Sequence, residues 1–257
     1  MKTRNSFPDK KLKISEPDHF ESSGTACHDV FCPPKSNSET KPPTLALCSV
    51  SKSYDGHPVL SNLSMEFSDG TFYCLMAPSG SGKTTLFRLI LGLEQPDSGT
   101  IQFHLSESPA ALRQETTSGS AFSARRSKGS HHPIPAVFQE DRLLEGYTAI
   151  ENLRFALGKR YSNETLTAYL LRLLPEDALN KPVCEFSGGM KRRVSILRAI
   201  LAPSEIILMD EPFTGLDTDT KQAAIDLIKE LCAGKLVIIA THAEQDAELL
   251  NARIIHL

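Results

Sequence analysis

The stretch that decides the fold runs Ala77-Pro78-Ser79-Gly80-Ser81-Gly82-Lys83-Thr84-Thr85. It follows a short apolar run at 72–76, which predicts a buried strand, and it opens a run at 84–93 with helical periodicity. Gly80 and Gly82 let the backbone fold so that successive N–H groups face an anion at the helix N-terminus. The strand, loop and helix in this order predict a phosphate-binding loop.

The loop supplies charge and metal chemistry as well as backbone amides. Lys83 would place a cation against the β- and γ-phosphates of a nucleotide, and the Thr84 hydroxyl can ligate Mg²⁺. We expect the remaining nucleotide-binding positions of this loop to be Pro78, Ser79, Gly80, Ser81, Gly82 and Thr85. Ala77 stands where such loops usually have their first glycine, which is the smallest possible change.

A second apolar run, Ile206–Met209, ends in Asp210 and Glu211. A carboxylate at a strand end can hold the Mg²⁺ ion, and the next carboxylate can polarise an attacking water. The alternative, that both merely solvate the strand end, is weak once the phosphate loop is present. Asp210 is therefore a predicted metal ligand, and Glu211 is the predicted general base.

Two further polar residues follow apolar runs directly. Gln139 comes after Val137 and Phe138, and we expect it to reach toward Mg²⁺ and the γ-phosphate, although an isolated Gln is normally a surface residue. His242 follows the apolar run 237–240, which would bring its imidazole to the same sheet edge to bond the γ-phosphate. Both are predicted catalytic residues, and Gln139 is also a predicted metal ligand.

In these residues the chain resembles the ATP-binding-cassette (ABC) ATPases, over residues 44–257. The segment 186–190 is similar to the family signature, usually Leu-Ser-Gly-Gly-Gln, with Phe186 and Met190 departing from it. The resemblance implies that Ser187, Gly188 and Gly189 contact ATP bound by a second subunit, giving a head-to-tail dimer with ATP and Mg²⁺. A helix N-terminus at these glycines would supply the N–H donors.

The resemblance extends to two other nucleotide contacts and to the fold. Tyr54 lies where the family stacks an aromatic ring on adenine, and Asp217 lies in a loop similar to its dimer-contact loop. The predicted fold class is α/β: a P-loop NTPase core with an antiparallel β subdomain and a small α-helical subdomain at about 140–200. Strand-like runs at 45–50, 64–67 and 72–76, and helix and strand alternation after 206, agree with it.

Two segments lack the apolar residues of a packed core. Residues 1–43 are rich in Ser, Pro, Lys and Glu, and we expect a disordered leader; residues 106–135 have the composition of a flexible insertion. The net charge of −3 argues against a nucleic-acid partner. The basic runs at 125–128 and 191–193 are expected to be solvated.

The segment 139–152 looks like the stretch that forms the permease groove in importer cassettes, most like those of nitrate, sulfonate and taurine uptake systems. It predicts that Leu143, Leu144 and Tyr147 line this groove; the alternative is that these apolar residues pack within the helical subdomain. The chain has no spanning apolar run and no secretory signal. These features imply an importer ATPase on the cytoplasmic face of the membrane, with a permease and a solute-binding protein. The alternatives are an exporter or lipoprotein-release ATPase, or a cassette acting on ribosomes or DNA.

Deleting residues 1–43 or residues 106–133 is expected to leave ATP affinity within a few-fold, because their composition cannot support a core. Titration of each purified deletion variant with a fluorescent ATP analogue would measure this. Loss of folding on either deletion would contradict the expectation.

Overall fold

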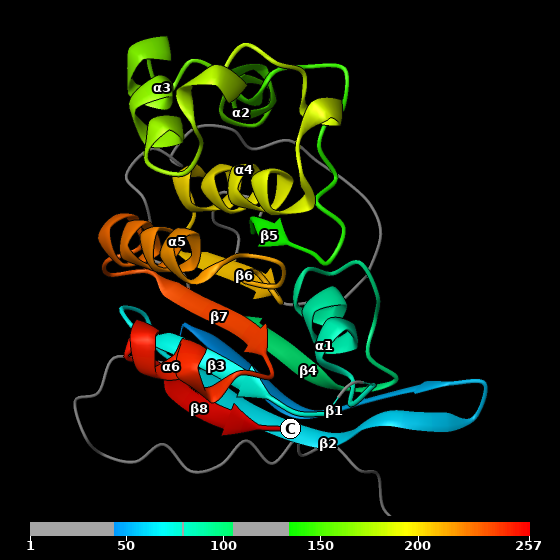
Figure 1. Ribbon diagram of the computed structural model, residues 1–257. Coiled ribbons are helices and arrows are strands. Elements are labelled where there is room, and N and C mark those ends of the chain that lie inside the picture. Colours follow the sequence, from blue (N-terminus) through cyan, green and yellow to red (C-terminus); the bar gives the residue numbers. More distant parts are fainter. Residues whose placement is uncertain (1–43, 79, 105–133) are drawn as a thin grey trace, which may run out of the picture. The chain divides into compact units, whose positions relative to one another are not determined.

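The computed structural model describes residues 44–78, 80–104 and 134–257 (Figure 1). The predicted leader, Ser79 and nearly all of the predicted insertion lie outside these ranges. Only residues 134 and 135 of the predicted insertion are described. The Pro135 carbonyl accepts a hydrogen bond from the Leu208 amide at 3.1 Å, so the chain has already joined the sheet there.

The central element is a five-stranded parallel sheet. Its strands lie in the order β5 (Ala136–Val137), β6 (Ile206–Asp210), β7 (Leu236–Thr241), β3 (Phe72–Met76) and β8 (Arg253–His256). The helices that belong to it are α1 (Lys83–Ile90), α4 (Gly188–Leu201), α5 (Thr218–Leu231) and α6 (Glu244–Leu250). The predicted α/β core is confirmed, although α1 ends at Ile90, three residues before the expected end.

Alternate residues of the central strands belong to two separate hydrophobic cores. Ile207, Met209 and Ile239 pack in one core with residues of the helical segments and of α4, α5 and α6. Leu208 and Ile238 pack in the other, with α1 and the antiparallel strands. A strand buried on both faces has no polar face to show, which explains the continuous apolar runs in the sequence.

A three-stranded antiparallel sheet covers the second core, with β1 (Leu45–Tyr54) between β2 (His57–Phe67) and β4 (Ser98–Phe103). The sequence predicts only the more apolar parts of β1 and β2 and misses β4. The reason is exposure: much of β2 and the first half of β4 faces solvent, so their composition is that of a loop.

The helical subdomain consists of α2 (Ala149–Leu157) and α3 (Asn163–Leu171), two 3₁₀ turns at Glu176–Ala178 and Val183–Glu185, and the start of α4. Thr148 and Glu151 form a reciprocal capping box at the start of α2. Gly158 ends α2 and Ser162 caps α3, so the chain breaks between the two helices at 158–162.

The described cysteines, Cys48, Cys74, Cys184 and Cys232, are free of disulfides. Burial raises the pKa of the Cys74 thiol to about 12 and that of Cys232 to about 11, which keeps both protonated. None of the helices in the described ranges combines the length and apolar character that crossing a bilayer requires.

Gly99 is the position where the antiparallel sheet tolerates least change. Its φ is +86°, and a Cβ there would lie 2.3 Å from the Ser49 carbonyl oxygen, beside the register shift between Cys48 and Ser51. We expect Gly99→Ala to lower the free energy of unfolding by about 3 kcal/mol, from left-handed strain plus the backbone clash. Urea unfolding followed by circular dichroism measures this.

Gly56→Ala is the matched control, since Gly56 has φ +79° and open space where a Cβ would stand. It should cost about 1 kcal/mol from conformational strain alone. Equal losses for the two variants would show that the close approach of β4 to β1 contributes nothing.

Candidate functional site

Four adjacent strands deliver the predicted site residues to one edge of the parallel sheet. Met76 at the end of β3 pairs with Thr241 of β7, and Asp210 at the end of β6 pairs with Ala240. The short β5 pairs with β6 and leads into Phe138 and Gln139. Because these parallel strands end at nearly the same level, the four segments that follow them emerge together.

The phosphate loop has the backbone that its glycines predict. Gly80 and Gly82 have φ of +82° and +94°, and α1 begins at Lys83. A Cβ on Gly82 would stand 2.9 Å from side-chain atoms of Val59 and Leu60, so only glycine fits. The Lys83 ammonium donates to the carbonyls of Ala77 at 2.6 Å and Pro78 at 3.0 Å, which holds it over the loop.

The loop fits a phosphate group. The Ser81 hydroxyl oxygen is buried and has no hydrogen-bond partner among the described residues. Buried hydroxyls are normally paired, and a phosphate oxygen would pair this one. The first-turn amides of α1 also need acceptors, because a helix supplies none for them. The Lys83 ammonium has three donors and uses two on carbonyls, so its third can bond a phosphate oxygen as well.

Thr84 and Asp210 meet at the start of α1 and the end of β6. The Thr84 hydroxyl donates to Asp210 Oδ2 at 2.6 Å. Burial raises the pKa of the Asp210 carboxyl and the Glu211 charge adds to this, while the Thr84 bond and the Lys83 charge oppose it. A hydroxyl and a carboxylate are the oxygen donors that Mg²⁺ takes, so this pair fits the metal that its position predicts.

Glu211 is held in an unusual conformation directly after Asp210. Its φ is +51°, a left-handed value that a non-glycine residue adopts at a cost, and such strain gathers at functional sites. Glu211 Oε2 lies 2.9 Å from His242 Nδ1 and accepts a hydrogen bond from the Thr214 hydroxyl at 3.1 Å. Two predicted catalytic residues thus meet, and Thr214 adds a contact that the sequence did not indicate.

Gln139 reaches the same edge, but the contacts that fix its segment are made by its backbone. The Arg192 guanidinium donates to the carbonyls of Phe138 and Gln139 and pairs with Asp141 at 3.2 Å. The Gln139 side chain is exposed. Its predicted contact with Mg²⁺ stays a prediction.

The expectation that residues 191–193 are solvated is wrong for Arg192, which is 8% exposed. The Arg193 guanidinium also has partners within the protein, since it donates to the carbonyls of Gly189 and Leu173. Paired guanidinium donors explain why these side chains lie inward. The sequence carried no local signal for this burial, because the neighbours of Arg192 are Lys191 and Arg193.

Ser187 caps α4, and its hydroxyl accepts a hydrogen bond from the Met190 amide at 3.3 Å. Gly188 and Gly189 form the first turn, and a Cβ on Gly189 would stand 3.0 Å from the Gly215 carbonyl. The signature segment therefore lies against the loop that ends in Asp217. Asp217 is exposed and caps α5 through the Thr220 amide at 3.0 Å.

Tyr54 closes β1 and is partly exposed. Its hydroxyl bonds to Glu94, and the Lys52 ammonium lies 5.6 Å from the ring centroid. The hydroxyl end of the ring is therefore held by Glu94, while part of the ring surface is accessible to solvent. The described contacts do not involve the phosphate loop, and stacking of Tyr54 on adenine stays a prediction.

A family model described as ABC transporter matches residues 60–214. The chain belongs to this family. Among solved ABC cassettes it is similar to MJ0796, a dimer in a post-hydrolysis state bound to ADP and Pi. The TM-score is 0.64 at 27% identity, and the match covers 83% of this chain and 94% of that one. The predicted ABC ATPase fold is thereby confirmed.

Among curated ABC relatives, the Nod factor export ATP-binding protein I of Rhizobium etli is 34% identical over 80% of this chain and 62% of its own length. The spermidine/putrescine import ATP-binding protein PotA of Fusobacterium nucleatum is 31% identical over 81% and 53%. The ergothioneine transport ATP-binding protein EgtV of Helicobacter pylori is 32% identical over 81% and 94%. The chain spans less than two thirds of the length of the first two. The likeness to nitrate, sulfonate and taurine systems receives no support here.

Glu211→Gln is expected to keep ATP binding and to slow hydrolysis by about a hundredfold or more, because an amide cannot take a proton from the attacking water. Single-turnover hydrolysis and equilibrium binding of ATP, measured on the same preparation, separate the two effects. Asp219→Asn, which removes an exposed carboxylate from the first turn of α5, is the control. An unchanged rate for Glu211→Gln would contradict the general-base assignment.

Proposed function

We propose that this protein is the ATP-hydrolysing subunit of an ABC transporter and works through a separate permease. One observation carries the hydrolytic part: the Glu211 carboxylate contacts His242 and directly follows Asp210, whose partner Thr84 belongs to the phosphate loop. A general base, a hydrogen-bond donor to the γ-phosphate and a pair of metal ligands thus lie at one sheet edge. These are the parts that ATP hydrolysis needs.

Each residue has a role that its contacts support. The loop amides and Lys83 bind the phosphates, Ser81 adds a hydroxyl, and Thr84 with Asp210 would hold Mg²⁺. Bound Mg²⁺ supplies positive charge that offsets the charge of the transferring phosphoryl group. Glu211 accepts the proton of the water, and His242 orients that carboxylate and contacts the γ-phosphate.

The proposed working form is a head-to-tail dimer. Ser187 and Gly188 are exposed at the N-terminus of α4, where free amides favour an anion. Gly189 lies against the Gly215 carbonyl, in the loop that leads to the exposed Asp217. The similar cassette MJ0796 is a dimer bound to ADP and Pi, which supports two nucleotides between two subunits here as well.

The proposed permease contact is an exposed apolar patch, defined here as Leu144, Tyr147 and Phe155. These side chains are 47%, 45% and 63% exposed. The Tyr147 and Phe155 rings meet edge to face with centroids 5.1 Å apart, so two of the three side chains already contact each other in the isolated subunit. The prediction for Leu143 needs correction, since it packs against the core instead.

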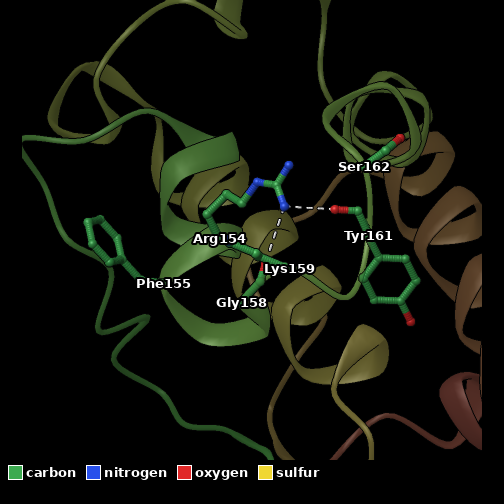
Figure 2. A pocket seen from close by; sticks show the side chains of 6 residues that line it. All are labelled: Arg154, Phe155, Gly158, Lys159, Tyr161 and Ser162. Atoms are coloured by element: carbon green, nitrogen blue, oxygen red, sulfur yellow. Dashed lines mark hydrogen bonds between the residues drawn. The ribbon is translucent and has the colours of Figure 1, made fainter.

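An open hollow of about 740 Å³ adjoins the patch around the C-terminal end of α2. Figure 2 shows Phe155 projecting from α2 on the side away from Arg154. Arg154 donates to the carbonyls of Gly158 at 3.2 Å and Tyr161 at 2.7 Å, which closes the loop from α2 to α3. Arg154 is therefore a structural brace, and the patch supplies the contact area.

The proposed direction of transport is import, which would add a solute-binding protein and place the subunit on the cytoplasmic face of the membrane. PotA, an import protein, supports this choice. Export is the second candidate, since the Nod factor export relatives have similar identity. Two measurements would decide between them: sequencing of the co-purified permease, and the direction in which the assembled transporter moves solute across the membrane of vesicles.

Tyr147→Glu and Phe155→Glu are expected to detach the subunit from membranes while ATP binding stays within about twofold, since a charge facing an apolar partner costs several kcal/mol. Leu171→Glu is the control, because Leu171 is 46% exposed in α3 outside the patch. Membrane flotation of the full chain expressed with its permease measures attachment.

Loss of folding in Tyr147→Glu or Phe155→Glu would assign the patch to the subdomain core instead. Attachment equal to that of the Leu171→Glu control would remove the patch from the permease contact. Purification with ribosomes or DNA and without any membrane protein would contradict the transport function.

A further inference from the structure

A buried ionic cluster lies directly behind His242. It joins Thr241 at the end of β7, Asp246 in α6 and Lys221 in α5. The Thr241 hydroxyl donates to Asp246 Oδ2 at 2.6 Å, and the Lys221 ammonium pairs with the other oxygen of that carboxylate. Asp246 is 3% exposed. A charge at this depth persists only with partners of this kind.

The Thr241 hydroxyl also bridges the two residues that flank His242. While it donates to Asp246, it accepts the amide N–H of Ala243 at 3.2 Å. The two bonds together fix the backbone turn that carries the imidazole. The His242 side chain itself is 71% exposed, so little else in the described chain restrains it beyond its 2.9 Å contact with Glu211.

Lys221 extends the cluster toward the segment of Glu211. Its ammonium lies 5.8 Å from the ring centroid of Phe213, which is buried two residues after Glu211. Its amide donates to the Asp217 carbonyl at 2.9 Å in the first turn of α5. Lys221 therefore contacts both the segment that carries Glu211 and, through Asp246, the turn that carries His242.

We infer that Thr241, Asp246 and Lys221 form a positioning unit that fixes the backbone turn of His242 and thereby holds its imidazole against Glu211. The inference rests on the proposed function, because it assumes that His242 and Glu211 act together in hydrolysis. None of the three side chains needs to touch ATP. Their effect passes through the orientation of the His242 turn.

Thr241→Val is the sharpest test. It keeps the volume of the buried side chain and exchanges the hydroxyl for a methyl group, whereas replacing Lys221 would leave the buried Asp246 charge without its cation and so endanger folding. Thr241→Ser keeps the hydroxyl and is the conservative control. Both variants are made in the full chain, and circular dichroism checks that each is folded.

The first measurement is amide hydrogen exchange, which does not depend on activity. Thr241→Val should raise exchange at Ala243 about tenfold or more, because that amide loses its acceptor, while the Ile238 and Ile239 amides of β7 keep their protection. Thr241→Ser should restore slow exchange. Unchanged exchange at Ala243 in Thr241→Val would overturn the inference.

The second measurement is single-turnover ATP hydrolysis in two backgrounds. Thr241→Val should lower the rate about tenfold with ATP affinity within twofold, and it should change the rate less than twofold when His242 is already Ala. An equal loss in both backgrounds, or no loss in either, would overturn the inference. If the unaltered chain fails to hydrolyse ATP, the proposed function fails, and the exchange result alone decides the inference.

Discussion

The site depends on the level alignment of four parallel strand ends. Met76 opposite Thr241 and Asp210 opposite Ala240 set the phosphate loop, the carboxylates and the His242 turn side by side. The alignment is fixed because β6, β7 and β3 are buried on both faces, and a slip by one residue would exchange their two hydrophobic cores. The register of the sheet therefore also fixes the relative positions of the site residues.

Polar groups next to this apolar sheet are satisfied within the protein with few exceptions. Thr84 pairs with Asp210, Thr241 pairs with Asp246, and Arg192 binds two backbone carbonyls. The buried Ser81 hydroxyl is an exception, because it has no hydrogen-bond partner among the described residues. A bound phosphate would supply one. Glu211, at the same edge, has the left-handed φ of +51° that a non-glycine residue adopts at a cost.

The sequence predicts the sheet and the site edge because both follow short-range rules. Apolar runs such as Ile206–Met209 locate buried strands, and the residues that follow them must emerge at the carboxyl edge. The glycines of the phosphate loop have positive φ, as the motif requires. Thus the positions of Lys83, Thr84 and Asp210 could be predicted from local pattern alone.

What the sequence missed depends on contacts between distant segments. The first half of β4 is exposed, and the strand pairs with β1 across 47 residues (Ser51 with Ser98) to 58 residues (Leu45 with Phe103), so no apolar run marks it. Arg192 belongs to a basic run, and only its distant partners at Phe138 and Gln139 explain its burial. Thr214 and Lys221 have ordinary loop and helix surroundings in sequence, and their importance appears only when the edge is assembled.

The central claim is that the exposed start of α4 binds a nucleotide held by a second copy of the chain. Light scattering on Glu211→Gln protein tests this most directly, because blocked hydrolysis preserves the ATP-bound form. The account predicts a dimer with ATP and Mg²⁺, a monomer with ADP, and a monomer with ATP once Ser187→Arg is added. A monomer with ATP in the presence of the permease, or a dimer that survives Ser187→Arg, would contradict it.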